Sequence, residues 1–232
     1  MSLEKLLITS GIIIVLIYLA FRLRRKIKLA FIRIIYGQYS YEYLSTHKRF
    51  FVMSPFQYCF KDDFISHIIY VLSKKEDVPS FKSHKEIFFE NTPYFIEYRE
   101  FLKQRGKPYC FNAYYFDHLG FEIKALGYQS TVMGSKAVIV YYFMNDAFFM
   151  GEYIFKNPKT NVKAKLAEHF LDKQELLDDN FYIENTKDRV IHYRNTGFTV
   201  DIKFLNREDR AVIENLQEYY KYITGKKLNR EL

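Results

Sequence analysis

The fold is decided by KAVIVYYFM at residues 136–144, the turn Asn145-Asp146 and AFFMGEYIF at residues 147–155. The first segment is β-branched and aromatic at almost every position, which is typical of a strand buried on both faces in the middle of a sheet. The Asn-Asp pair favours a tight turn, so the second segment is predicted to be the hairpin partner of the first. Residues 121–129 are predicted to form a third strand.

Shorter strands and several helices are predicted around this hairpin. Three strands are expected after it, FYIEN at 181–185, RVIHY at 189–193 and FTVDIKF at 198–204. Helices are expected at 62–74, 93–105, 161–177 and 206–225, because capping residues precede apolar residues at helical spacing. This order of elements predicts a single α+β domain over residues 40–232, with a mostly antiparallel sheet flanked by helices.

The order of elements over residues 92–225 resembles the secretion-chaperone-like α+β fold, which includes the YbjN-type proteins. The resemblance rests on that order and not on a residue motif. It implies a domain that binds other proteins, often as a dimer, and that is not an enzyme.

The composition indicates a folded protein whose excess charge lies at one end. The 232 residues are 49% hydrophobic, 27% charged and 19% aromatic. Residues 1–33 hold seven Lys and Arg against one Glu, which is six of the eight net positive charges. The remainder is close to neutral and has no basic stripe, so nucleic-acid binding is not expected.

The N-terminus contains the apolar run LLITSGIIIVLIYLAF at residues 6–21. A helix from Leu3 to Leu23 would be about 30 Å long, which matches a bilayer core. A cleaved signal peptide and a buried core helix are the alternatives, but the strong positive charge follows the run. Residues 1–23 are therefore expected to be a transmembrane signal-anchor. The chain would cross the cell membrane once, with its N-terminus outside and its C-terminal domain in the cytoplasm.

Residues 24–39 are predicted to be a basic amphipathic juxtamembrane helix. Apolar residues between Leu23 and Ile35 recur on one helical face. One interpretation is an interfacial helix that binds anionic membrane lipid, and the other is a topology-setting flank that continues into the core of the domain. A hinge is expected at residues 37–45. The predicted membrane-interface residues are Arg22, Arg24, Arg25, Lys26, Lys28 and Arg33.

No motif for catalysis or metal binding is found. The chain has no phosphate-binding loop and no nucleophile elbow, and its six histidines are scattered. Asp117, His118 and Glu122 form the best local group of possible ligands, and they are interpreted as solvated loop residues. Cys59 and Cys110 lie among aromatic residues and are expected to be free core cysteines, a reactive thiol being the alternative. We therefore predict no catalytic residues, no metal and no cofactor.

Glu152 stands alone in the apolar segment AFFMGEYIF. A carboxylate at that position faces solvent, pairs with a base or lines a site. Together with Asp146 it is the candidate for a polar contact on the sheet.

These observations favour a single-pass membrane-anchored cytoplasmic module that binds protein as an adaptor, within an envelope or secretion assembly. A membrane-tethered enzyme without short motifs is the alternative, and a sensor or toxin-neutralising protein is a third. Expected partners are anionic membrane lipid, another protein and, as a homo-oligomer, a second copy. The many Phe and Tyr residues reflect either compositional bias or a protein-binding surface.

Overall fold

The computed structural model describes residues 3–57, 59, 78–117, 119–172, 178–208, 212–218 and 221, with side chains from Ser10 onward. The chain forms two compact units, residues 1–55 and residues 56–232. The helix predicted at 62–74 lies outside the described residues. Of the predicted last helix, residues 212–218 are described and are helical.

The first unit consists of two helices, α1 (Leu3–Tyr36) and α2 (Tyr41–Phe51). Gly37 ends α1 with a positive φ of 90°, a conformation that glycine adopts without steric cost. The Ser40 hydroxyl then accepts a hydrogen bond from the Tyr43 amide at 3.1 Å and so caps α2. The predicted hinge at 37–45 is therefore a short turn followed at once by a helix.

The predicted transmembrane segment is corrected by the structure. Among the described residues, no helix is both long enough and apolar enough to cross a membrane. The prediction of a single-pass signal-anchor is therefore wrong.

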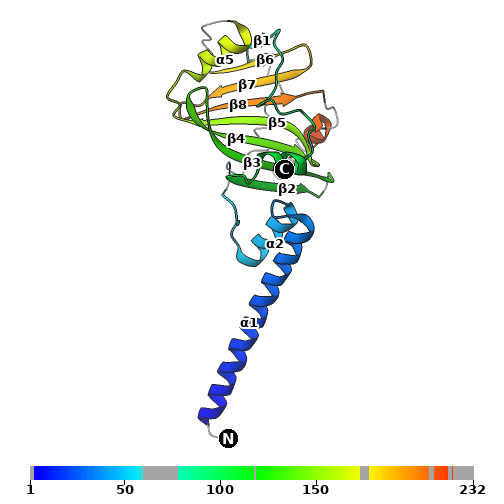
Figure 1. Ribbon diagram of the computed structural model, residues 1–232, viewed down its shortest axis with the longest axis vertical. Helices are drawn as coiled ribbons and strands as arrows, with labels where there is room; N and C mark the ends of the chain where they lie inside the picture. The colour runs from blue at the N-terminus through cyan, green and yellow to red at the C-terminus, as the bar shows by residue number, and fades with distance from the viewer. Residues whose placement is uncertain are drawn as a thin grey trace, which may run out of the picture. The chain divides into compact units, whose positions relative to one another are not determined.

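The second unit contains one eight-stranded sheet in the order β1-β6-β7-β8-β5-β4-β3-β2 (Figure 1). The β1–β6 pair is parallel, and the other neighbours are antiparallel. Its strands are β1 (Ser80–Lys82), β2 (Cys110–Phe116), β3 (Phe121–Val132), β4 (Ser135–Met144), β5 (Ala147–Lys156), β6 (Asn180–Glu184), β7 (Arg189–Asn195) and β8 (Thr199–Asn206).

The central hairpin forms as the sequence predicts. Asn145 and Asp146 connect β4 to β5 with φ values of 47° and 68°, the left-handed conformation that suits a two-residue hairpin turn. β5 pairs on its other side with β8, which is the last strand in the described part of the chain. This non-local pairing brings the charged residues of β8 beside Glu152.

The two faces of the sheet have different cores. On the first face, α4 (Tyr98–Arg105) and α5 (Val162–Leu171) pack with an aromatic cluster around Phe89. Gly151 makes room for Phe89, because a Cβ atom at this glycine would lie 2.0 Å from the ring. The second face has a mixed core in which Val212 and Leu216 pack with residues of β3, β4, β5 and β8.

Candidate functional site

A row of polar side chains crosses the second face of the sheet. In the strand register, Glu152 on β5 lies opposite Lys203 on β8, and Lys203 lies opposite His192 on β7. Each strand contributes through its period-two alternation, which points Glu152, Lys203 and His192 to the same face. All three are buried, with 5%, 3% and 1% of their surface exposed.

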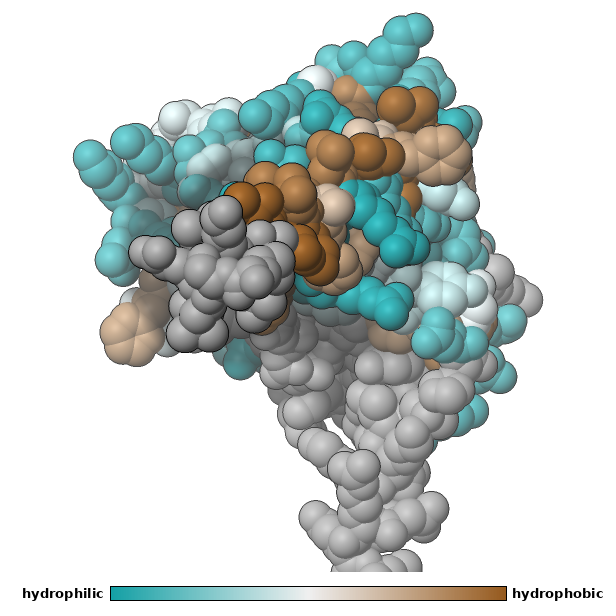
Figure 2. All heavy atoms as spheres, turned by 90° about the horizontal axis from the view of Figure 1, so that it is seen from below, coloured by the Kyte–Doolittle hydropathy of each residue, from teal (hydrophilic) through white to brown (hydrophobic). Residues whose placement is uncertain are grey.

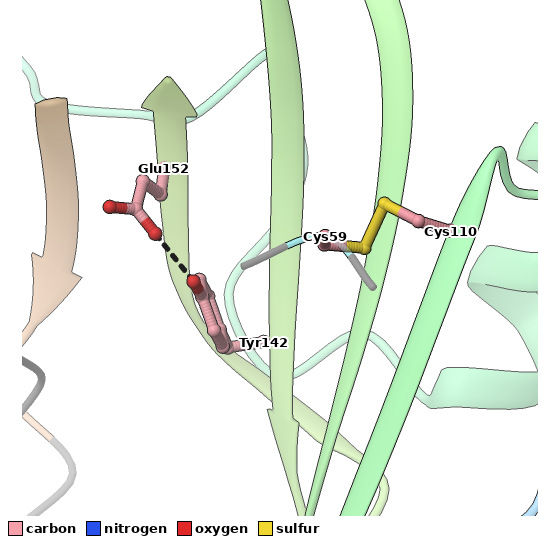
Figure 3. Close-up of a disulfide and its surroundings, with 4 residues drawn as sticks. All are labelled: Cys59, Cys110, Tyr142 and Glu152. Carbon is pink, nitrogen blue, oxygen red and sulfur yellow. Dashed lines mark hydrogen bonds between the residues drawn. A yellow bond between two sulfur atoms is a disulfide. The ribbon is translucent and has the colours of Figure 1, made fainter. Parts of the chain in front are cut away.

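Glu152 is held by two partners within this row. Its Oε1 atom lies 2.6 Å from the Lys203 Nζ atom. Its Oε2 atom accepts a hydrogen bond from the Tyr142 hydroxyl (Figure 3). A buried charge is tolerated when an opposite charge and hydrogen bonds replace its water. Of the alternatives that the sequence leaves open for Glu152, the structure therefore selects pairing with a base.

The chemistry open to this cluster is limited by the state of Tyr142. Burial, the negative charge of Glu152 and the hydrogen bond to Glu152 together raise the pKa of the Tyr142 phenol well above its ordinary value. The phenol therefore stays protonated at neutral pH and donates a hydrogen bond to the carboxylate. A donor fixed in this way is suited to holding Glu152 in place rather than to accepting a proton as a base.

His192 extends the cluster toward β6. One of its ring nitrogens, Nε2, lies 2.8 Å from the Asn180 Oδ1 atom, and its ring packs against Tyr182 with centroids 4.7 Å apart. The hydrogen bond fixes the orientation of the imidazole. Because His192 packs between Lys203 and Tyr182 in the register, the row is continuous from β5 to β6.

Asp146, the other predicted sheet residue, belongs to a separate ion pair. Its carboxylate lies 2.6 Å from the Lys124 Nζ atom, which also lies 3.0 Å from Glu122. Burial lowers the pKa of Lys124, but the hydrogen bonds and charges of Asp146 and Glu122 outweigh it, and the pKa is raised. The structure thus gives Asp146 and Glu152 one lysine each and does not join them in one site.

Glu122, one of the three possible metal ligands named from the sequence, forms an ion pair with Lys124. His118 lies outside the described residues. Among the side chains that the structure describes, no group of three or more His, Cys, Asp or Glu residues could hold a metal ion.

The two cysteines are joined in a disulfide, so the prediction that both are free is wrong. Cys110 begins β2, a strand that the sequence interpretation missed, and Gln57 forms a parallel bridge to the same residue. The disulfide lies over Gly127 of β3. A Cβ atom at this glycine would be 2.2 Å from the Cys110 Sγ atom and 2.7 Å from the Cys59 Sγ atom. The bond therefore requires a residue without a side chain at position 127.

The predicted membrane-interface residues all lie on α1. Arg25 is engaged within the first unit, because its guanidinium lies 4.2 Å from the centre of the Phe21 ring and donates to the Phe50 carbonyl at 3.4 Å. Lys28 lies 5.8 Å from the centre of the Phe50 ring. No such contact is recorded within the described chain for Arg22, Arg24 or Lys26.

Lys203 and Tyr142 were missed in the sequence, although one signal was available. In FTVDIKF the charged residues Asp201 and Lys203 alternate with apolar ones, which places both charges on one face.

Comparison with family models, with curated proteins and with solved structures finds no match to this chain. The resemblance to the secretion-chaperone-like fold therefore stays a prediction.

Proposed function

We propose that this chain is a non-catalytic binding module that docks on an anionic lipid surface through the first unit, residues 1–55. The observation that carries the proposal is the combination of exposed apolar and basic side chains on α1. A protein partner and a homo-oligomer, which the sequence also suggests, stay predictions.

The apolar side chains of α1 are exposed over most of the described helix. Ile12, Ile14 and Ile17 are 55%, 66% and 64% exposed, and Ile27, Phe31 and Ile34 continue the apolar surface toward the end of the helix. The space-filling view shows hydrophobic residues gathered together (Figure 2). A contiguous apolar patch of this kind is typical of a protein–protein or membrane contact.

The charge next to this patch favours anionic lipid as its occupant. Six basic residues lie from Arg22 to Arg33, and the single acidic residue of α1, Glu4, lies at the other end of the helix. A helix with apolar residues beside a basic cluster binds at the boundary between headgroups and acyl chains. Each basic residue near an anionic surface contributes about 1 kcal/mol.

The packing of α1 with α2 distinguishes basic residues that contact the rest of the first unit from basic residues that can bind lipid. Leu29 on α1 and Leu44 on α2 are buried, and Arg25 contacts Phe21 and Phe50. Arg24 and Lys26 have no such role within the described chain. Replacing these two should weaken lipid binding without unfolding the unit, whereas replacing Arg25 should also loosen the helix pair.

The test is co-flotation of the full chain with phosphatidylcholine vesicles that contain or lack phosphatidylglycerol. We expect binding to the anionic vesicles at low salt and release at high salt. Changing Arg24 and Lys26 together to Gln should weaken partition by about thirtyfold, from about 1 kcal/mol per charge. The matched control changes Lys107 and Lys159, two exposed lysines of the second unit, to Gln and should leave partition unchanged.

Three results would overturn the proposal. They are equal binding to neutral and anionic vesicles, an equal loss in the control variant, and self-association through α1 with no vesicle binding at all. The last would assign the apolar patch to a second copy of the chain.

A further inference from the structure

A groove of about 560 Å³ lies on the sheet of the second unit, at the ends of β3, β4 and β5. Its size is within the roughly 300–1,000 Å³ of pockets that hold small molecules. It is lined by Gln129, Ser130, Thr131, Lys136, Ala137, Val138, Ile154 and Lys156. Neither the ion pair of Asp146 nor the cluster around Glu152 supplies a lining residue.

The floor of the groove is aliphatic. Val138 and Ile154 are directly opposite each other on β4 and β5, and both are partly buried against the core of the second face. Gln129 lies opposite Val138 on the other side. A strip of two branched side chains next to an amide can accommodate a short alkyl chain.

Two lysines face each other beside this floor. Ala137 and Phe155 are paired, so Lys136 and Lys156 come next along their strands and lie opposite each other. Alternation along the strands puts them on the same face as Val138 and Ile154. Like charges directly opposite in an antiparallel pair destabilise a sheet.

No carboxylate relieves this repulsion within the described part of the chain. The two buried lysines among the described strands have acidic partners, Lys124 with Asp146 and Lys203 with Glu152. Lys136 and Lys156 are exposed at the groove, and no ion pair or hydrogen bond of their side chains is recorded among the described residues. An anion between the two ammonium groups would convert the repulsion into two attractions.

We infer that the groove binds a small amphiphilic anion, with its carboxylate or phosphate between Lys136 and Lys156 and its alkyl chain along Val138 and Ile154. Thr131, opposite Lys136, supplies a hydroxyl that can donate to the same head group. This inference concerns the second unit and does not rest on the proposed docking of the first unit on lipid.

The test is calorimetric titration of the full chain with decanoate, kept below the concentration at which it forms micelles. Decanol and inorganic phosphate serve as the probes that lack the charge and the alkyl chain. We expect decanoate to bind and each of the other two to bind at least tenfold more weakly. Dodecyl phosphate should bind like decanoate, since the head-group chemistry is shared, and anionic vesicles should not compete if the free monomer is the ligand.

Single variants assign the contacts. Lys136→Gln and Lys156→Gln should each weaken decanoate binding at least fivefold, and Val138→Thr should weaken decanoate without changing the response to phosphate. Lys159→Gln, an exposed lysine that does not line the groove, is the matched control. Because each lysine variant removes a repulsion, its thermal unfolding midpoint without ligand should not fall, which separates lost binding from lost folding.

The inference would be overturned by decanol binding as tightly as decanoate, or by lysine variants that bind like the wild type. It would also be overturned by binding that begins only when micelles form. Loss of vesicle binding by the first unit would leave these results unaffected, so the two proposals fail separately.

Discussion

Gly127→Ala should be incompatible with the disulfide and harmless without it. The added Cβ atom would lie 2.2 Å from the Cys110 Sγ atom and 2.7 Å from the Cys59 Sγ atom. Bonded sulfur atoms cannot rotate away independently, so β2 would have to move against β3. Overpacking of this kind costs about 1–3 kcal/mol of unfolding free energy.

The effect of Gly127→Ala on the unfolding free energy should change sign when both cysteines are replaced by alanine. The Cβ atom at position 127 then meets the Cβ atom of residue 59 at 3.5 Å, an ordinary contact. Alanine is favoured over glycine inside a strand by about 0.5–1 kcal/mol, so Gly127→Ala should then stabilise the sheet. The coupling between the two changes should be about 2 kcal/mol or more.

The assay is urea unfolding of the four proteins of this cycle, followed by circular dichroism. Gly151→Ala is the matched control, because its Cβ atom would meet Phe89 on the other face and its cost should be the same in both backgrounds. In the background with cysteines, part of the Gly127→Ala protein should fail to form the disulfide and keep thiols that react with Ellman's reagent. An equal cost of Gly127→Ala in both backgrounds, with no free thiol, would refute the reasoning.

Two further predictions concern buried polar groups of the sheet unit. Glu152→Gln leaves the buried Lys203 ammonium without its counter-charge and should lower the unfolding free energy in urea by about 3–5 kcal/mol. The exposed pair of Lys85 and Asp172 is the control, since Asp172→Asn should cost less than about 1 kcal/mol, and equal effects would contradict a desolvated pair at Glu152. Burial and the charge of Asp179 raise the pKa of Tyr193 to about 12 from 10.0, so its phenol keeps its proton more tightly when folded. Stability from this group is present below pH 10 and declines as the pH rises toward 12. An alkaline titration by tyrosine absorbance should lose one tyrosine from the phase near pH 12 in Tyr193→Phe, and an unchanged curve would contradict this.

Local sequence signals predicted the strands well where they were strong. The β-branched run of β4 and the Asn145-Asp146 turn specify a hairpin by themselves, and residues 181–204 alternate clearly enough to reveal three strands. α4 begins at Tyr98 rather than after Thr92-Pro93, because Phe95 has a φ of 70° and its amide binds the Phe148 carbonyl at 2.9 Å. That contact joins distant segments and has no local signature.

The candidate sites could not be predicted in full, because they depend on pairing between strands that are distant in the sequence. Glu152 could be recognised as unusual, but its partner lies on β8, 51 positions further along the chain. The cysteines could be paired only once Cys110 was placed on β2, next to the bridge at Gln57. The opposed lysines of the groove required the register of β4 and β5. For α1, the apolar character was visible, but no helix in the described part of the chain is both long enough and apolar enough to cross a membrane.

The disulfide also determines how the second unit would carry mechanical load. Cys59 lies four residues beyond Pro55, the last residue of the first unit, and it is bonded directly to β2. If the first unit is held at a surface, tension along the chain passes through the sulfur atoms into a strand hydrogen-bonded along its length to β3. The 50 residues between the two cysteines are bypassed. Reduction would move the point of loading from the sheet edge to that intervening segment.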